Sequence, residues 1–462
     1  MSFSSRFLLW SGCTVPRSTG GDRAGALPQI VNDLLGFSRA VSGYSLLTGL
    51  GLLLGFAREL TVASTYGLSS SLDVFVAVMT VQLFFGTQIG NAVETAFISR
   101  VAKQGGAVAV GQSLLPALYG LMLVNVGIAV ILLGGAGLLV GTIFPRFDAA
   151  QQTLAVRTLH VLLLPIICAS TAGLLRGALA VLGSFAPGFL AGSIVSMCTI
   201  LSIVFLSPSL GIDALTLGVA AGNLCVLILF AVQLIRLSQP NTWRRPTGSN
   251  AGWFVLWGAA ATVLIGELVY SGVAVTERSL ASQLPAGSIA GFFYASTIVS
   301  VPLSLLFIPL TTMTFPLMVE AFGRDSRAGL ELFKKQGVLL LIASVAVVVI
   351  VTLFARPIVE LVFMRGQFSA EHARFTASLL SVTIFALPFM SLGRLLRNSY
   401  YSLADYRTPV LGFGIQWAVL AGLGFVLGSR YGAQGLAVAM VAGEAASTLT
   451  MGVLFASNVR WR

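Results

Sequence analysis

Acidic and basic side chains stand next to each other at the ends of two long apolar segments. Arg58 and Glu59 end one such segment, and Glu277 with Arg278 end another. A charge at mid-membrane costs about 2.5–3.5 kcal/mol, so it usually faces a bundle interior or a watery cavity. We expect both arginines to bind an anionic substrate in a central cavity, with the two glutamates as gate partners. In the alternative interpretation, both pairs are helix-end residues that reach the lipid headgroups.

Polar residues also interrupt the apolar segments themselves. Gln88, Asn91 and Glu94 recur at three-residue spacing and therefore share one helical face. We expect Gln88 and Asn91 to contact substrate. Glu94, Glu267 and Asp73 are candidates for a gate or for ion coupling, because intramembrane acids often serve ion pathways. The alternative for Glu94 and Glu267 is a protonated carboxyl group that is hydrogen-bonded to a neighbouring helix.

The chain carries no motif for covalent chemistry or for a metal. Four cysteines show no paired spacing, and His160 and His372 form no metal-binding motif. No nucleophile–base pair and no phosphate-binding loop stand out. The sequence therefore predicts a non-enzyme without cofactor or metal, driven by the membrane potential or by an H⁺ or Na⁺ gradient.

Composition places the elements that must position these residues in a membrane. The 462 residues are 56% hydrophobic and 9% charged, against about 25% charged in soluble domains. Runs of roughly 20 apolar residues recur, each long enough to cross a bilayer as a helix. We predict an all-α polytopic membrane protein with about twelve helices, near residues 40–57, 72–98, 114–144, 154–182, 186–206, 212–237, 253–277, 288–321, 334–355, 374–402, 409–428 and 432–457.

The basic residues are distributed unevenly between the two sides of the predicted membrane. The chain has a net charge of +11, but its basic residues form no dense patch, so no nucleic-acid partner is expected. With the N terminus inside, 19 of the 27 Lys and Arg fall in inner loops and tails. This asymmetry predicts a multi-pass membrane protein with both termini cytoplasmic. The other eight are Arg58, Arg146, Arg157, Arg278, Arg356, Arg365, Arg374 and Arg430.

The chain divides into two similar halves. Segments 63–77 and 281–295 match at an offset of 218, and "LLRGALAVL" resembles "LLRNSYYSL" at an offset of 221. We predict a cytoplasmic tail at 1–39, six-helix lobes at 40–237 and 253–457, and a linker at 238–252. An even helix number per lobe places the pseudo-two-fold axis along the membrane normal, as in transporters built from parallel repeats.

Four segments carry a resemblance to a known family: "LLGFAREL…YGLSSSLDVFVAVM", "GFFYASTIVSVPLSLLFIPLTTMTFPLM", "PIVELVFMRGQFS" and "SYYSLADYRTPV". They resemble the MurJ/MviN family of the multidrug/oligosaccharidyl-lipid/polysaccharide exporter superfamily. The resemblance implies two lobes around a cationic cavity. It also implies a flippase of the bacterial cytoplasmic (inner) membrane that moves a polyprenyl-pyrophosphate-linked saccharide to the outer leaflet. Arg58 matches the family's first-helix arginine, and Asp73 matches the acid that opens helix two.

The departures from the family pattern concern its cavity arginines. Where lipid II flippases carry an arginine pair in helix two, this chain has Phe84–Thr87, and Ser296–Thr297 replaces Asp-Arg in helix eight. The chain also ends after twelve helices. We therefore expect an exopolysaccharide-type substrate, with a glycan polymerase, glycosyltransferases and membrane lipids as partners. The alternatives are a lipid II flippase of peptidoglycan synthesis, an ion-coupled multidrug antiporter that uses Glu94 and Glu267, and an assembly protein that has lost transport.

Overall fold

Every regular element that the structure describes is helical. The computed structural model describes residues 47–101, 107–237, 251–403, 405 and 407–460. The predicted tail at 1–39 lies outside the described residues, as does nearly all of the predicted linker. After a first helix, Leu47–Tyr66, the elements are α3 (Ser70–Gln82), η1 (Leu83–Thr87), α4 (Gln88–Val101), α5 (Ala107–Ile143), α6 (Ala149–Val181), α7 (Ala186–Leu210), α8 (Asp213–Leu237), α9 (Ala251–Ala281), α10 (Ser288–Pro302), η3 (Leu303–Phe307), α11 (Ile308–Arg324), α12 (Ser326–Leu353), α13 (Ala355–Phe363), α14 (Ala370–Thr383), η4 (Ile384–Ala386), α15 (Leu387–Ser402) and α16 (Arg407–Arg460).

The predicted number of membrane-spanning helices is confirmed. In the described part of the chain, 11 helices are long and apolar enough to cross a bilayer. The last of them, in α16, contains Gly432 with φ 61° and ψ −143°. These dihedral angles lie outside the α-helical region, so the helix is interrupted at this residue. Counting α16 as two spans therefore gives twelve. Several spans, including α3–η1–α4, are single continuous helices with a short irregular turn inside.

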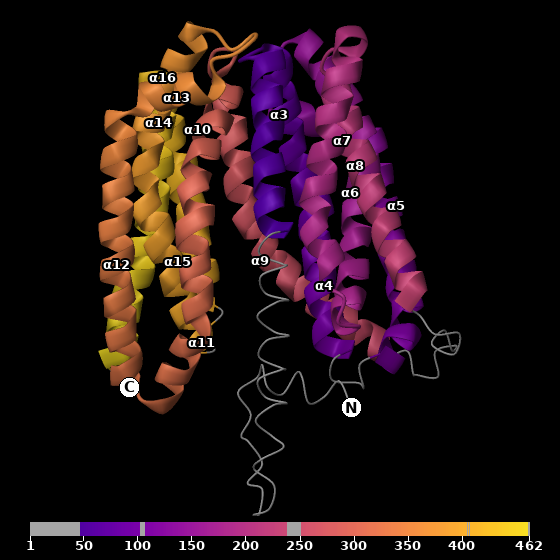
Figure 1. Cartoon of the computed structure of the whole chain (residues 1–462), viewed down its shortest axis with the longest axis vertical. Helices are drawn as coiled ribbons and strands as arrows, with labels where there is room; N and C mark the ends of the chain where they lie inside the picture. Colours follow the sequence, from indigo (N-terminus) through magenta and orange to yellow (C-terminus); the bar gives the residue numbers. More distant parts are fainter. Residues whose placement is uncertain (1–46, 102–106, 238–250, 404, 406, 461–462) are drawn as a thin grey trace, which may run out of the picture. The chain divides into compact units, whose positions relative to one another are not determined.

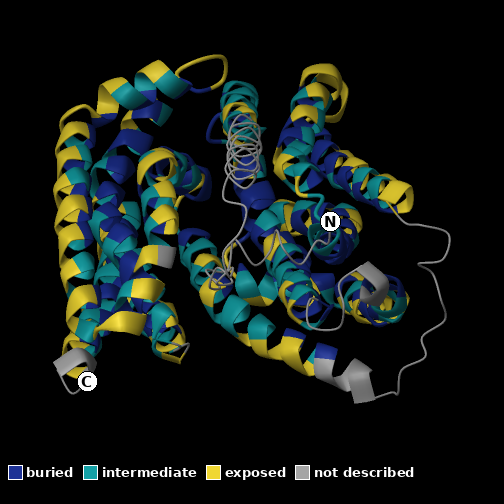
Figure 2. Ribbon diagram, turned by 60° about the horizontal axis from the view of Figure 1, so that its bottom comes forward, coloured by how far each residue is buried: buried dark blue, intermediate teal, exposed yellow. Residues whose placement is uncertain are grey.

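The helices pack into two lobes that follow the order of the sequence. In the first lobe, α6 packs against α4, α5 and α8, and α7 packs against α8; in the second, α15 packs against α11, α12 and α16 (Figure 1). Exposed residues line the outer faces of these helices, as Figure 2 shows, where lipid can cover them. Helix α9 packs against both α16 and α4, so it joins the lobes.

Two irregular turns support the internal duplication more strongly than the sequence does. The π-helical turns η1 and η3 interrupt the second helix of each lobe at Leu83–Thr87 and Leu303–Phe307, an offset of 220. A π turn places one additional residue in a helix and is rare outside functional segments. Capping boxes at Asp148 and Ser369 begin the fourth helix of each lobe, at an offset of 221. Independent local features thus recur in register in both halves.

Three arginines were assigned inconsistently by the sequence. The count of basic residues by side placed Arg176, Arg394 and Arg397 with the inner loops, whereas the predicted helices 154–182 and 374–402 contain them. The structure agrees with the helices: Arg176 lies within α6, and Arg394 and Arg397 lie within α15 and are half-buried. The loop assignment was wrong because a basic side chain near the end of an apolar run is usually assigned to a loop.

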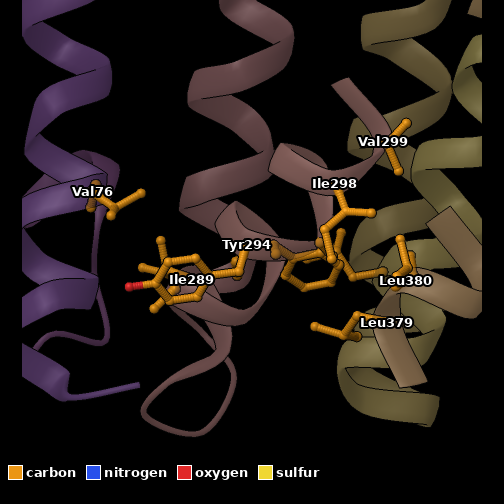
Figure 3. Packing of buried hydrophobic residues seen from close by; sticks show 14 of the residues in the cluster. Val76, Ile289, Tyr294, Ile298, Val299, Leu379 and Leu380 are labelled. Carbon is orange, nitrogen blue, oxygen red and sulfur yellow. The ribbon is translucent and has the colours of Figure 1, made fainter. Parts of the chain in front are cut away.

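An aromatic cluster lies where the two lobes meet. Tyr294 of α10 is fully buried and packs against Phe363 and Phe368, with ring centroids 4.9 and 5.5 Å apart. Figure 3 shows its side chain reaching from α10 toward α3, on which Val76 lies. The buried apolar cluster to which Tyr294 and Val76 belong takes residues from both lobes. This packing holds α3 and α10 together beside the site described next.

Candidate functional site

Asp73 joins the two lobes by capping a helix that belongs to the other lobe. Its carboxylate accepts hydrogen bonds from the backbone amides of Gly287 and Ala290, at 2.5 and 2.7 Å. The first amides of a helix lack partners within the helix and carry partial positive charge. Gly287, the N-cap residue of α10, has no side chain to supply an acceptor. Asp73, which is 3% exposed, supplies it from α3.

Further hydrogen bonds between the lobes lie at this same end of the helices. Together with the Asp73 contacts they define what we call the closed end: Arg146 Nη1 to Gln283 O at 2.9 Å, Ser279 Oγ to Ile143 O at 2.5 Å, and Gln367 N to Ser64 O at 2.8 Å. Each of these bonds has a backbone carbonyl as its acceptor. The closed end is therefore held by hydrogen bonds that can be replaced by water when the lobes separate.

Two glycines make this close approach possible. Gly366 has φ 57°, and a Cβ atom there would lie 2.2 Å from Ser64 O. Gly287 has φ 87°, and its Cβ would lie 2.9 Å from Leu68 O. Positive φ favours glycine, and any larger residue would also collide with the opposite lobe. Both positions therefore require glycine while the two lobes are in contact at the closed end.

The two adjacent charge pairs predicted for the cavity mouth each form an ion pair. Arg58 Nη2 lies 2.5 Å from Glu59 Oε1, and Arg278 Nη1 lies 2.6 Å from Glu277 Oε1. The side chains of Arg278 and Glu277 are only 13% and 14% exposed, which argues against the headgroup interpretation for this pair. Because each arginine is neutralised by its neighbour, neither offers a free positive charge in this conformation. Substrate binding by Arg58 and Arg278 stays a prediction.

A cavity of about 340 Å³ lies between the lobes. It is bordered by α3, η1 and α4 of the first lobe and by α9, α10, α14, η4, α15 and α16 of the second. Of the predicted site residues, Gln88 and Glu277 line it. The other polar lining residues are Thr80, Tyr270, Ser271, Ser296, Ser300, Thr383, Gln416 and Glu444.

In the first lobe, the predicted polar face of α4 forms one connected network. Arg176 Nε lies 3.0 and 2.9 Å from the two carboxylate oxygens of Glu94, and its Nη2 donates to Asn91 Oδ1 at 3.1 Å. Asn91 Nδ2 donates to Gln88 Oε1 at 3.4 Å. Gln88 then donates to Ser271 Oγ of α9 at 2.7 Å, which carries the network to the second lobe. Glu94 is thus an ion-pair partner within its own lobe.

In the second lobe, the structure reveals a polar cluster that the sequence analysis did not assign to the site. Arg397 lies over the Phe413 ring, with its Cζ 5.2 Å from the ring centroid. Arg394 donates from Nε to Thr311 Oγ1 at 3.1 Å. Glu444 accepts a hydrogen bond from Gln416 at 2.7 Å. The match of "LLRG" to "LLRN" had already aligned Arg397 with Arg176, but it was used only as a sign of the internal repeat.

Glu267 lies half-buried on α9. The structure shows no hydrogen bond or ion pair for its carboxylate within the described residues, and it is not among the residues that line the cavity. Tyr270 follows Glu267 by three residues on α9, and Tyr270 and Glu444 both line the cavity. Within the described ranges, no three His, Cys, Asp or Glu side chains are grouped as metal ligands would be. Ion coupling through Glu267 therefore stays a prediction.

Comparison with known proteins identifies the family of this chain. The family model described as "Lipid II flippase MurJ" matches residues 62–458. The chain belongs to the MurJ family. The MurJ resemblance seen in the sequence is thereby confirmed, and a flippase is a transporter rather than an enzyme.

Individual MurJ relatives are distant. A probable lipid II flippase MurJ of Bdellovibrio bacteriovorus is 26% identical over 313 residues, which are 66% of this chain and 59% of that protein. Another, of Aquifex aeolicus, is 28% identical over 394 residues, or 79% of this chain and 73% of the relative. The solved structure "Lipid II flippase MurJ, inward closed conformation" superposes with a TM-score of 0.79 at 19% identity and covers 90% of this chain and 87% of that one. That likeness shows the fold, including the two-lobe arrangement.

Proposed function

We propose that this chain is a flippase that moves a polyprenyl-diphosphate-linked saccharide across the membrane, and that its substrate is lipid II. Membership of the MurJ family supports this, as does a cavity between two lobes that a small set of hydrogen bonds holds together at one end. The single observation that carries the mechanism is the capping of α10 by Asp73 across the lobe interface. It is a contact that forms only when the lobes meet.

The choice of lipid II differs from the substrate that the sequence favoured. The segment Phe84–Thr87 and Thr297 stand where the resemblance predicted cavity arginines, and this loss suggested an exopolysaccharide-type unit. The relatives that match this chain are named lipid II flippases, which favours the alternative. Despite the arginines missing at these two positions, the site keeps positive charge, because Arg394 and Arg397 lie in α15 of the second lobe. We therefore prefer lipid II over the exopolysaccharide unit.

The proposed cycle uses the closed end as a gate. While the hydrogen bonds of the closed end are formed, the substrate headgroup enters the cavity from the opposite side. The lobes then rock, the Asp73 contacts and their neighbours break, and the headgroup leaves toward the other leaflet. Glu59 and Glu277 hold Arg58 and Arg278 in the closed conformation, and separation of the lobes is the step at which these arginines can exchange a carboxylate for a phosphate.

The energy source is proposed to be the membrane potential or an ion gradient. Glu267 and Glu444 are the acids we assign to coupling, because both lie in the second lobe, Glu444 in the cavity wall and Glu267 three residues before Tyr270 of that wall. Protonation or cation binding there would change the charge that faces the substrate. We place the protein in the bacterial cytoplasmic membrane with both termini inside and the closed end outside, as the distribution of basic residues predicts.

Genetic replacement tests the proposed substrate. The chain is expressed in a bacterium depleted of its own lipid II flippase, and cell lysis is scored; an exopolysaccharide-flippase mutant is scored in parallel for surface polysaccharide. Prevention of lysis without rescue of the polysaccharide is expected. Rescue of the polysaccharide alone, with the chain inserted in the membrane in both strains, would restore the exopolysaccharide interpretation and refute lipid II.

A further inference from the structure

We propose that Arg394 and Arg397 of α15 form the binding site for the substrate's diphosphate, a phosphate-type oxyanion, at the side of the cavity away from the closed end. This inference rests on the proposed function, since it names the residues that would hold the headgroup of that substrate. In the closed conformation the anion then binds two arginines that were counted with the inner loops, because Arg58 and Arg278 are paired with glutamates until the lobes separate.

The first step concerns position. Met390 of α15 lines the cavity, and Arg394 and Arg397 follow it at i+4 and i+7. Residues at these spacings lie on one face of a helix, so the arginines continue the cavity-lining face of α15 toward its C-terminus. The helical segment that contains them begins at Ala370, beside the closed end. At 1.5 Å per residue, Arg397 lies about 40 Å along it from that end.

The second step concerns unsatisfied donors. Arg397 makes no hydrogen bond and no ion pair within the described residues, and its guanidinium instead lies over the Phe413 ring. Arg394 uses only Nε, toward Thr311. A guanidinium carries several N–H donors in a rigid fork that matches phosphate oxygens. These two half-buried side chains therefore retain most of their donors for a ligand.

The third step concerns charge. The two guanidinium groups repel each other, and Glu444 is the acid that acts on Arg397. Glu444 Oε1 is occupied by the hydrogen bond from Gln416, and one carboxylate balances at most one of the two arginines. A bound oxyanion would supply the missing negative charge and accept the free N–H groups.

The internal repeat supplies the contrast. Arg176 is the first-lobe counterpart of Arg397 by the sequence match, and both carboxylate oxygens of Glu94 and the side chain of Asn91 already occupy it. Arg58 and Arg278 are likewise paired with the neighbouring glutamates. Of these four cavity-region arginines, Arg397 alone lacks a hydrogen-bonding partner among the described residues. The asymmetry places the anion against the second lobe.

A binding measurement on the full chain tests the proposal. The wild-type chain in nanodiscs of zwitterionic lipid is titrated with farnesyl diphosphate, and farnesol serves as the uncharged control probe. We expect R394Q and R397Q each to weaken binding of farnesyl diphosphate at least about tenfold, the loss of one charge-assisted hydrogen bond. R397K keeps the charge but not the fork and should fall between R397Q and the wild type.

R324Q is the matched control. It removes one positive charge from the same lobe, but Arg324 is 77% exposed and paired with Glu320, so binding should not change. Thermal unfolding of each variant identifies any that fail to fold. If R397Q fails to fold, the affinity of R397K is compared with that of the wild type instead. Unchanged affinity in R394Q and R397Q, or no binding of farnesyl diphosphate to the wild-type chain, would overturn the site.

A second arm separates substrate from membrane lipid. The titration is repeated in nanodiscs that contain phosphatidylglycerol. Strong competition by phosphatidylglycerol in the wild type that disappears in R397Q would assign the site to a lipid headgroup and overturn the substrate assignment. Failure of the proposed function looks different: farnesyl diphosphate binds through these arginines, yet the chain does not replace a lipid II flippase in cells.

Discussion

Replacing Asp73 by alanine should open the closed end. The substitution removes both acceptors of the Gly287 and Ala290 amides and leaves the N-terminus of α10 uncapped. Hydrogen bonds to a charged group contribute about 1.5–3 kcal/mol each. The closed conformation should therefore lose at least about 3 kcal/mol relative to one in which water solvates these amides, a shift of about 150-fold in the equilibrium. D73N keeps one acceptor, so about half this loss, or about tenfold, is expected.

Distances between spin labels across the closed end measure this shift. In a chain without native cysteines, labels are placed at S209C in the first lobe and E371C in the second, which are exposed helix-end positions. The wild-type background should give one short distance, and D73A should add a longer population. Asp148 provides the control, because it caps α6 within its own lobe through Gln151 at 2.7 Å. Identical distance distributions for D73A, D148A and the background would refute the role of Asp73 as a lobe contact.

Three other substitutions probe the remaining parts of the site. G366A places a Cβ 2.2 Å from Ser64 O at φ 57° and should disrupt the closed end by roughly 1–3 kcal/mol, scored by the same labels; an unshifted distance would contradict it. R176Q leaves Glu94 with an unpaired charge and should lower the unfolding temperature, whereas R176Q/E94Q should recover part of the loss, with a coupling of about 0.5–3 kcal/mol in a double-mutant cycle. E267Q should abolish the response of transport to pH and Na⁺; transport that keeps its wild-type response would assign Glu267 a structural role.

The sequence predicted the architecture because the bilayer constrains it so strongly. Apolar runs of helix length leave almost no other choice, and two local matches indicated the repeat. The division of α16 was predicted as well, because the expected helices 409–428 and 432–457 are separated close to Gly432, where the backbone leaves the α-helical conformation. The π-helical turns at Leu83 and Leu303 were not predicted, since nothing in their composition distinguishes them from an ordinary helix.

The site was harder to predict, because electrostatic partners come from distant parts of the chain. The sequence identified Asp73 and Gln88, but not that each bonds to the other lobe, at Gly287 and Ser271. It also could not decide between a free and a paired arginine. Arg58 seemed available for substrate and is paired, whereas Arg397 seemed to be a loop residue and lacks a carboxylate partner in the described residues.

Translocation by the reconstituted chain tests the central claim, that opening of the closed end moves the headgroup across. Liposomes receive fluorescent lipid II in the inner leaflet, and its arrival outside is followed with a membrane-impermeant quencher. The chain carries S64C and Q367C, at positions whose backbone atoms are hydrogen-bonded at 2.8 Å, in a background without native cysteines. The account predicts no arrival while the cysteines are quantitatively crosslinked and recovery after reduction. Translocation at an undiminished rate by the crosslinked chain would contradict it.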